Sequence, residues 1–113
     1  MKIFLDDERA APEGWILVKT PHDAIVLLQT GEVTMISLDH DLGLSDDQTG
    51  YTVLLWLEEQ VAMNNFVPPD VIMVHTANSG ARIKMDQAVS KIFSLSPEKI
   101  DWDYTARAKG QSK

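Results

Sequence analysis

The chain has 113 residues, 44% of them hydrophobic, and this size and composition predict a single folded domain over residues 1–113. The net charge of −7 disfavours bulk DNA or RNA binding, and the longest apolar run, VLLWL, is too short to span a membrane. The absence of cysteine excludes disulfides and thiolate metal sites, and it fits a reducing interior, so we expect a cytoplasmic protein.

The first third of the chain predicts two strands and a helix. KIFL (2–5) and ILVKT (16–20) are the expected strands, separated by a turn-rich loop that contains APEGW. Thr20 is the expected cap of a helix that begins at Pro21 and is closed by Gly31.

The remainder predicts two more strands and two more helices. TMISL (34–38) and VIMV (71–74) are apolar enough for buried strands. A helix is expected over 51–65, and Ser79 is the expected cap of a last helix over about 80–93. Residues 100–105 fit either an edge strand or an irregular tail, and 106–113 form a basic tail.

This order of elements favours an α/β fold. Continuous apolar strands are typical of a parallel sheet covered by helices on both faces, so a flavodoxin-like three-layer sandwich with strand order 2-1-3-4 is predicted. The connection from Glu8 to Trp15 is short for a parallel crossover. It is expected to hold a short helical turn at 8–12, or else the first strand pair is irregular.

Polar residues follow the first, third and fourth predicted strands. In an open α/β sheet, ligands bind beyond the carboxyl ends of the strands, where the strand order reverses. Groups that are about thirty residues apart in sequence should therefore meet at one edge. These groups are Asp6, Asp7, Asp39, His40, Asp41, His75 and Thr76.

Carboxylates that lie this close together resist ionisation unless a cation compensates them. A hard divalent ion with oxygen ligands, Mg²⁺ or Mn²⁺, is one solution. An ion pair with Arg9 or Arg82 is the other, and a single Asp after a strand also serves as an ordinary turn cap. The candidate metal ligands are Asp6, Asp7, Asp39 and Asp41.

The motifs LDDER, LDHDLG, TGY and VHTANSGARIKM, together with Pro12 and the GW pair, resemble a receiver-type domain. More closely, the chain is similar to the cyclic-phosphate processing receiver domains, from Lys2 to about Ile92. The resemblance implies a flavodoxin-like, receiver-like fold. It also implies a metal-assisted site that acts on cyclic phosphates, such as RNA 2′,3′-cyclic ends or cyclic nucleotides.

The implied chemistry assigns roles to several of these residues. His40 and His75 are the expected base and acid, because imidazole titrates near neutral pH, and Asp39 either holds the metal ion or attacks covalently. Phosphate oxygens are expected to bind the amides at the start of the last helix and four side chains. These side chains are Arg9, Thr76, Asn78 and Arg82.

Two other functions stay open at this point. Ordinary receivers have a Lys after a fifth strand, and neither can be placed here, so a phospho-accepting receiver is the less favoured alternative. A non-catalytic interaction module with a protein partner is the other. The expected ligand under the main hypothesis is a small phosphorylated molecule or an RNA end.

Overall fold

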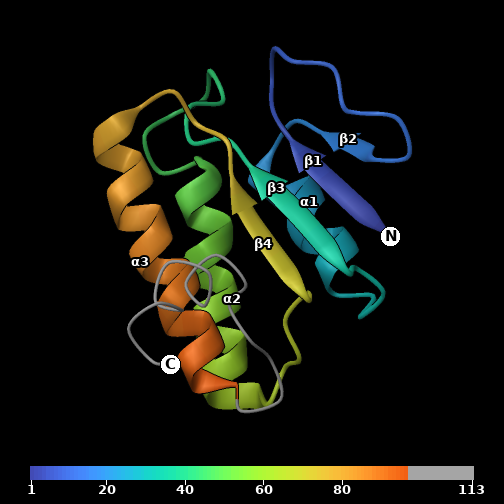
Figure 1. The fold of residues 1–113 in the computed structure, drawn as a ribbon, viewed down its shortest axis with the longest axis vertical. Helices are drawn as coiled ribbons and strands as arrows, with labels where there is room; N and C mark the ends of the chain where they lie inside the picture. Colours follow the sequence, from blue (N-terminus) through green and yellow to red (C-terminus); the bar gives the residue numbers. More distant parts are fainter. Residues whose placement is uncertain (97–113) are drawn as a thin grey trace, which may run out of the picture.

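The computed structural model describes residues 1–96, which form a four-stranded sheet and three helices (Figure 1). The strands are β1 (Lys2–Leu5), β2 (Ile16–Val18), β3 (Met35–Leu38) and β4 (Val71–Val74). All neighbouring strands pair in parallel, in the order β2-β1-β3-β4. The predicted α/β fold, parallel sheet and strand order are confirmed.

Each helix begins at a side-chain cap. Helix α1 (Pro21–Leu28) has Thr20 as its cap, as predicted, and α2 (Gly50–Asn64) begins at a capping box built on Thr49. Helix α3 (Ser79–Leu95) is capped by Asn78, so the prediction of a Ser79 cap is wrong by one position. Asn78 is the cap because its side-chain oxygen accepts the backbone N–H of Ala81 at 3.0 Å.

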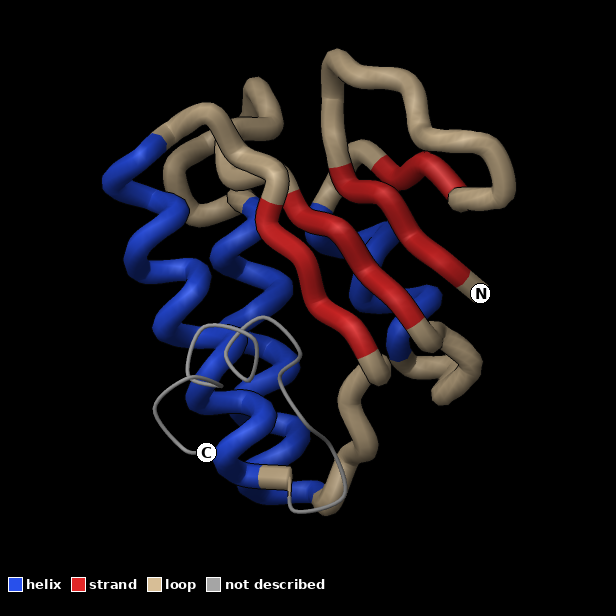
Figure 2. Tube along the Cα trace, viewed as in Figure 1, coloured by secondary structure: helices blue, strands red, loops and turns tan. Residues whose placement is uncertain are grey.

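The helices lie on one side of the sheet. In Figures 1 and 2 the strands are in front, α1 lies behind β1 and β3, and α2 and α3 lie behind and beside β4. The connections that contain helices, β2 to β3 and β3 to β4, move across the sheet in the same direction, so right-handed crossovers put them on the same face. The connection from β1 to β2 moves in the opposite direction.

That opposite connection, residues 6–15, contains no helix. The short helical turn expected at 8–12 does not form, yet β1 and β2 still pair in parallel with Ile3 opposite Ile16. A second helical layer, which a three-layer sandwich requires, is therefore not found within residues 1–96. The expectations for 100–105 and 106–113 lie outside the described residues.

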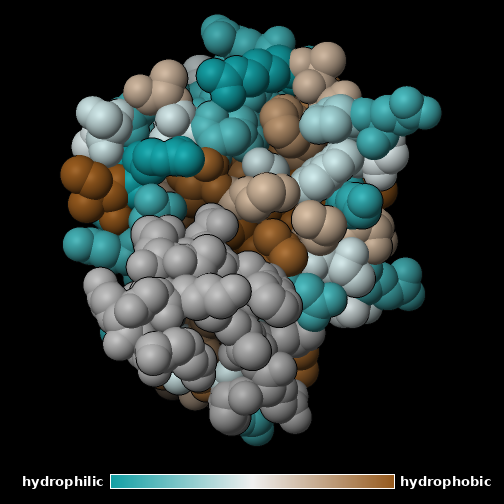
Figure 3. Space-filling view, in the orientation of Figure 1, coloured by the Kyte–Doolittle hydropathy of each residue, from teal (hydrophilic) through white to brown (hydrophobic). Residues whose placement is uncertain are grey.

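The face turned toward the viewer in Figure 1, here called the front face, is partly apolar. Residues that alternate with the core positions point to it, among them Phe4, Ser37 and Met73. Trp15 packs edge-on against Phe4, with ring centroids 6.4 Å apart. Figure 3 shows apolar atoms in the middle of this face, over the strands.

The core lies between the sheet and the helices. Its fully buried side chains come from β1, β3 and all three helices, and they include Leu5, Leu28, Leu38, Leu54 and Met85. Among residues 1–96, no helix is both long enough and apolar enough to cross a membrane.

Gly50, the first residue of α2, lies directly against the end of β3. Its N–H donates to the His40 carbonyl at 3.1 Å, and a Cβ at this position would clash with the Asp39 carbonyl oxygen. The missing side chain thus lets α2 start beneath the strand end that carries Asp39.

We expect Gly50→Ala to destabilise the fold by about 1–3 kcal/mol, because backbone must move to admit the methyl group. Gly80→Ala is the matched control: it adds the same methyl group in the first turn of α3, where the nearest neighbouring atom would be 3.7 Å away. The control should be neutral or slightly stabilising, since Ala favours a helix over Gly. Urea unfolding of both variants measures the difference, and equal stabilities would contradict the close-approach argument.

Candidate functional site

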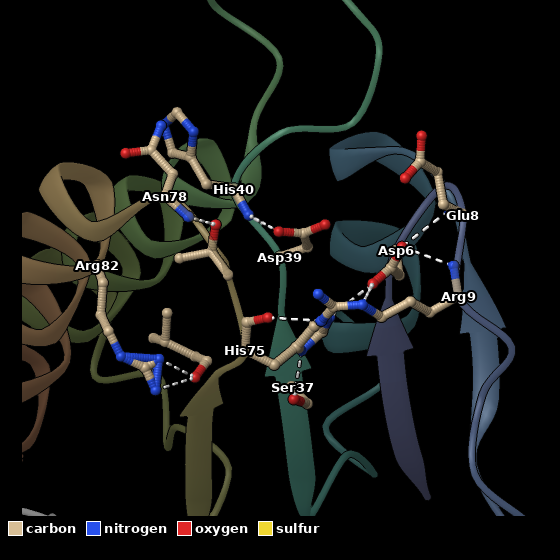
Figure 4. A network of polar contacts seen from close by, with 11 residues as sticks. Asp6, Glu8, Arg9, Ser37, Asp39, His40, His75, Asn78 and Arg82 are labelled. Carbon is tan, nitrogen blue, oxygen red and sulfur yellow. Dashed lines mark hydrogen bonds and ion pairs between the residues drawn. The ribbon is translucent and has the colours of Figure 1, made fainter.

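The residues that directly follow β1, β3 and β4 lie in a single row at the carboxyl edge of the sheet. The last paired row of β1, β3 and β4 is buried against the helices. Since side chains alternate along a strand, the next row points to the front face. This row consists of Asp6, Asp39 and His75, whose side chains are drawn in Figure 4.

The two carboxylate oxygens of Asp6 have different partners: one binds the backbone of the turn after β1, and the other faces His75 and Arg9. The side chain is only 1% exposed. Oδ1 accepts the backbone N–H groups of Glu8 at 2.8 Å and Arg9 at 2.9 Å, which fixes the turn after β1. Oδ2 lies 3.0 Å from His75 Nε2 and 3.9 Å from Arg9 Nε. The turn-cap interpretation of Asp6 is therefore right for one oxygen, while the other faces the row.

These contacts keep Asp6 ionised. Burial raises the pKa of Asp6, but the N–H groups of Arg9 and Glu8 and the His75 imidazole together lower it below the ordinary value of 3.8. An ionised carboxylate only accepts hydrogen bonds, so the nitrogen of His75 that faces it carries a proton.

His75 crosses the front face from β4 toward β1. Its ring stacks on Phe4, with centroids 4.3 Å apart and planes 5° from parallel. Nδ1 lies 2.7 Å from the hydroxyl of Ser37, a residue of β3 that is 5% exposed. Sequence reasoning missed Ser37. Its only signal was a hydroxyl within the apolar strand TMISL, which by itself does not indicate a site.

The side chains of Asp39 and His40 have different surroundings: the Asp39 carboxylate lies in the row, and the His40 ring contacts Asp41. Asp39 Oδ1 accepts the backbone N–H of His40 at 2.7 Å, and its carboxylate lies in the row beside Asp6. His40 Nδ1 is 2.7 Å from the exposed Asp41 Oδ1.

Asp6 and Asp39 of this row line a cleft of about 360 Å³, whereas His75 is not among its lining residues. Two other hollows, of about 460 and 410 Å³, lie along β2 and α1 and at the opposite edge of the sheet. The charge of its lining, rather than its size, therefore distinguishes the cleft. The lining consists of five carboxylates and one guanidinium, with small residues between them: Asp6, Asp7, Glu8, Asp39, Asp41, Arg9, Gly43, Thr76 and Ala77.

The predicted phosphate ligands fall into two groups. Arg9 and Thr76 line the cleft, whereas Asn78 and Arg82 are not among its lining residues. Asn78 caps α3, and both terminal nitrogens of Arg82 donate to the Val74 carbonyl at 2.8 and 2.9 Å. Of the two arginines expected to compensate the acids, only Arg9 lies beside one.

Asp6, Asp39 and His75 could together hold a metal ion. Each offers one ligand atom, and these atoms all lie within 4.8 Å of one another. The sequence predicted two of the three as ligands and gave His75 a catalytic role only. Asp7 and Asp41 line the cleft but are not in this three-residue group, and Asp41 Oδ1 lies 2.7 Å from His40 Nδ1 instead.

The geometry agrees with the result of comparing the chain with known families. A family model described as the cyclic-phosphate processing receiver domain matches residues 1–91, most of the chain. The chain belongs to this family. Comparisons with curated proteins and with solved structures found no match.

As a cyclic-phosphate processing receiver domain, the protein has its acidic residues where the motifs predicted them. The acidic residues Asp6 and Asp7 follow β1, and Asp39 follows β3. The hydroxyl residue that the motifs also predicted, Thr76, comes after β4. The family match ends within α3, close to the limit that the motifs indicated.

The contacts of Asp6 should make the free energy of unfolding depend on pH. Because the folded pKa is lowered, the unfolded chain binds a proton more readily than the folded one. The stabilisation from Asp6 is therefore complete above its ordinary pKa of 3.8 and is lost as the pH falls through the lower folded value. We expect Asp6→Asn to cost about 1–3 kcal/mol at neutral pH.

Urea unfolding between about pH 6 and about pH 3 measures this dependence. Asp6→Asn should lose less stability with acid than the parent does, while Asp46→Asn, a change in the exposed loop after β3, should keep the parental profile. Identical acid profiles for the parent and Asp6→Asn would contradict the assigned contacts.

Proposed function

We propose that the cleft is a divalent-cation site that binds cyclic phosphates, such as RNA 2′,3′-cyclic ends or cyclic nucleotides, and hydrolyses them. One observation carries the proposal: Asp6, Asp39 and His75 bring three ligand atoms within 4.8 Å of one another at the carboxyl edge of a parallel sheet. The name of the family supports the choice of cyclic phosphate.

The ligand atoms of Asp6, Asp39 and His75 suit a hard divalent cation that also accepts an imidazole nitrogen. Asp6 is ionised, and Asp39 keeps one carboxylate oxygen beyond the one that accepts the His40 N–H. Two carboxylates fit Mg²⁺ or Mn²⁺, and the imidazole of His75 favours Mn²⁺. Asp7 and Asp41, which line the same cleft, remain candidates for outer contacts or water-mediated ones.

Arg9 is the candidate phosphate anchor. Its side chain is 53% exposed, and Nη1 donates to the His75 carbonyl at 2.8 Å, which holds the guanidinium beside the row. A guanidinium has five donors in a planar fork, so several remain for phosphate oxygens. The Thr76 hydroxyl accepts the Asn78 N–H at 3.1 Å, which leaves its own proton free to donate to a phosphate oxygen.

Opening a cyclic phosphodiester forms one bond from phosphorus to a water oxygen and breaks one bond to a ribose oxygen, which then takes a proton. A bound cation would neutralise charge on the phosphoryl oxygens and polarise the water. Because Nε2 of His75 would bind the cation, it would not also supply that proton. His40, oriented by Asp41, is the candidate group to take a proton from the water and return one to the leaving ribose oxygen, and Asp39 is the candidate for covalent attack in place of water.

Cation binding should raise thermal stability. A ligand that binds only the folded state adds about 2.7 kcal/mol at a hundredfold excess over Kd. We expect a concentration-dependent rise in Tm with Mn²⁺ and a smaller rise with Mg²⁺ at equal concentration. Without cation, Asp39→Asn should be at least as stable as the parent, because the repulsion between carboxylates is relieved. On addition of cation, its Tm should not rise.

Asp46→Asn is the control for that experiment, because it removes one carboxylate from the loop without touching the row. It should respond to cation as the parent does. An equal Tm rise in Asp39→Asn and the parent would show that the cation binds elsewhere.

Phosphorus NMR tests the reaction itself. We expect loss of the resonance of a 2′,3′-cyclic or 3′,5′-cyclic nucleotide with Mg²⁺ or Mn²⁺, and no loss with chelator. Asp39→Asn should abolish turnover, and Arg9→Ala should weaken substrate binding by removing about 1.5–3 kcal/mol of charged hydrogen bonding. Manganese is chelated before recording, because it broadens the lines.

The same experiment separates the other functions. Spectra that stay unchanged with nucleotides, and with a short RNA that ends in a 2′,3′-cyclic phosphate, would favour an interaction module. A stable acyl phosphate at Asp39 after exposure to a small phosphodonor would favour a phospho-accepting receiver.

A further inference from the structure

The imidazole of His75 is fixed by three neighbours on two other strands. Asp6 faces Nε2 at 3.0 Å, Ser37 faces Nδ1 at 2.7 Å, and Phe4 covers one face of the ring. The His75 side chain is 17% exposed, so little of the ring is left to water. Figure 4 shows the ring between Asp6 and Ser37, at the end of the row.

These contacts determine which nitrogen carries the proton. The ionised carboxylate of Asp6 only accepts, so Nε2 carries a proton and donates it. In the neutral ring Nδ1 is then an acceptor, and the Ser37 hydroxyl is the donor that satisfies it.

A hydroxyl also satisfies the opposite arrangement. If Nε2 gives its lone pair to a cation, the ring proton must sit on Nδ1, and the Ser37 oxygen can accept it. The proton moves from one ring nitrogen to the other and none is lost. Ser37 can therefore pair with Nδ1 before and after cation binding, which Ala could not do.

The carboxylate, imidazole and hydroxyl form the same set of groups as a nucleophilic triad. Ser37, however, is 5% exposed and lies within β3, two residues before Asp39 on the same face of the sheet. Its hydroxyl is not accessible to a substrate in the cleft, so the arrangement orients His75 rather than activating a serine.

We propose that Ser37 is a positioning residue that holds the His75 ring with Nε2 in the row and pairs with Nδ1 in either tautomer. The part of this proposal that concerns cation binding rests on the proposed function. The part that concerns the hydrogen bond from Ser37 to Nδ1 in the cation-free protein does not.

Nitrogen-15 NMR of protein labelled at histidine tests both parts. In the cation-free parent we expect His75 to be protonated at Nε2. In Ser37→Ala the proton should stay on Nε2, because Asp6 still accepts it, but the Nδ1 resonance should move to that of an acceptor without a hydrogen bond, and Ser37→Thr should restore the parental resonance. His22 and His40 serve as internal references, because no contact joins either of them to Ser37 within the described residues. An unchanged Nδ1 resonance of His75 in Ser37→Ala would overturn the proposal.

Adding Zn²⁺, a diamagnetic probe that accepts imidazole, tests the second part. In the parent the proton should move to Nδ1, and Ser37→Ala should raise the Kd for Zn²⁺ about tenfold or more, with recovery in Ser37→Thr. If the Nδ1 resonance shifts in cation-free Ser37→Ala but no variant responds to Zn²⁺ at His75, the positioning role stands and the cation site is wrong. If Ser37→Ala does not fold, Ser37→Cys, a weak hydrogen-bonding partner of similar volume, takes its place in both arms.

Discussion

The carboxylate of Asp6 is the contact on which both the loop and the site depend. One oxygen holds the turn that leads from β1 to β2 without a helix, and the other holds His75 of β4 across the end of β3. A buried ionised group is costly unless every contact is satisfied, and here backbone N–H groups and an imidazole supply them. A single side chain thus couples three strands at the edge where the other acids gather.

The rest of the site follows from register. Parallel pairing of β1, β3 and β4 aligns Asp6, Asp39 and His75 in one row, and alternation turns this row to the face that no helix covers within residues 1–96. The same alternation turns the preceding row into the core. Gly50 then lets α2 begin directly beneath Asp39, so the acidic edge is supported by a buried helix start rather than by a loose loop.

Much of this fold could be predicted from apolar runs and turn residues. The fourth strand was expected at 71–74, where it lies, and the α2 helix was expected within one residue of its ends. The errors were local. Asn78 caps α3 in place of Ser79, and the loop after β1 has no helical turn, although the Asp6 side chain accepts the N–H groups of Glu8 and Arg9 as a helix cap would.

The sequence by itself determined which polar residues end each strand, because strand bounds follow from local apolar patterns. It also determined that Asp6, Asp39 and His75 would meet at one edge. Only the tertiary structure decided that they share a row from which Asp7 is excluded, that Arg82 donates to the Val74 carbonyl outside the cleft, and that Ser37 faces His75. Those facts depend on strand register and on which face each side chain takes, and a shift of one residue in pairing would reverse them.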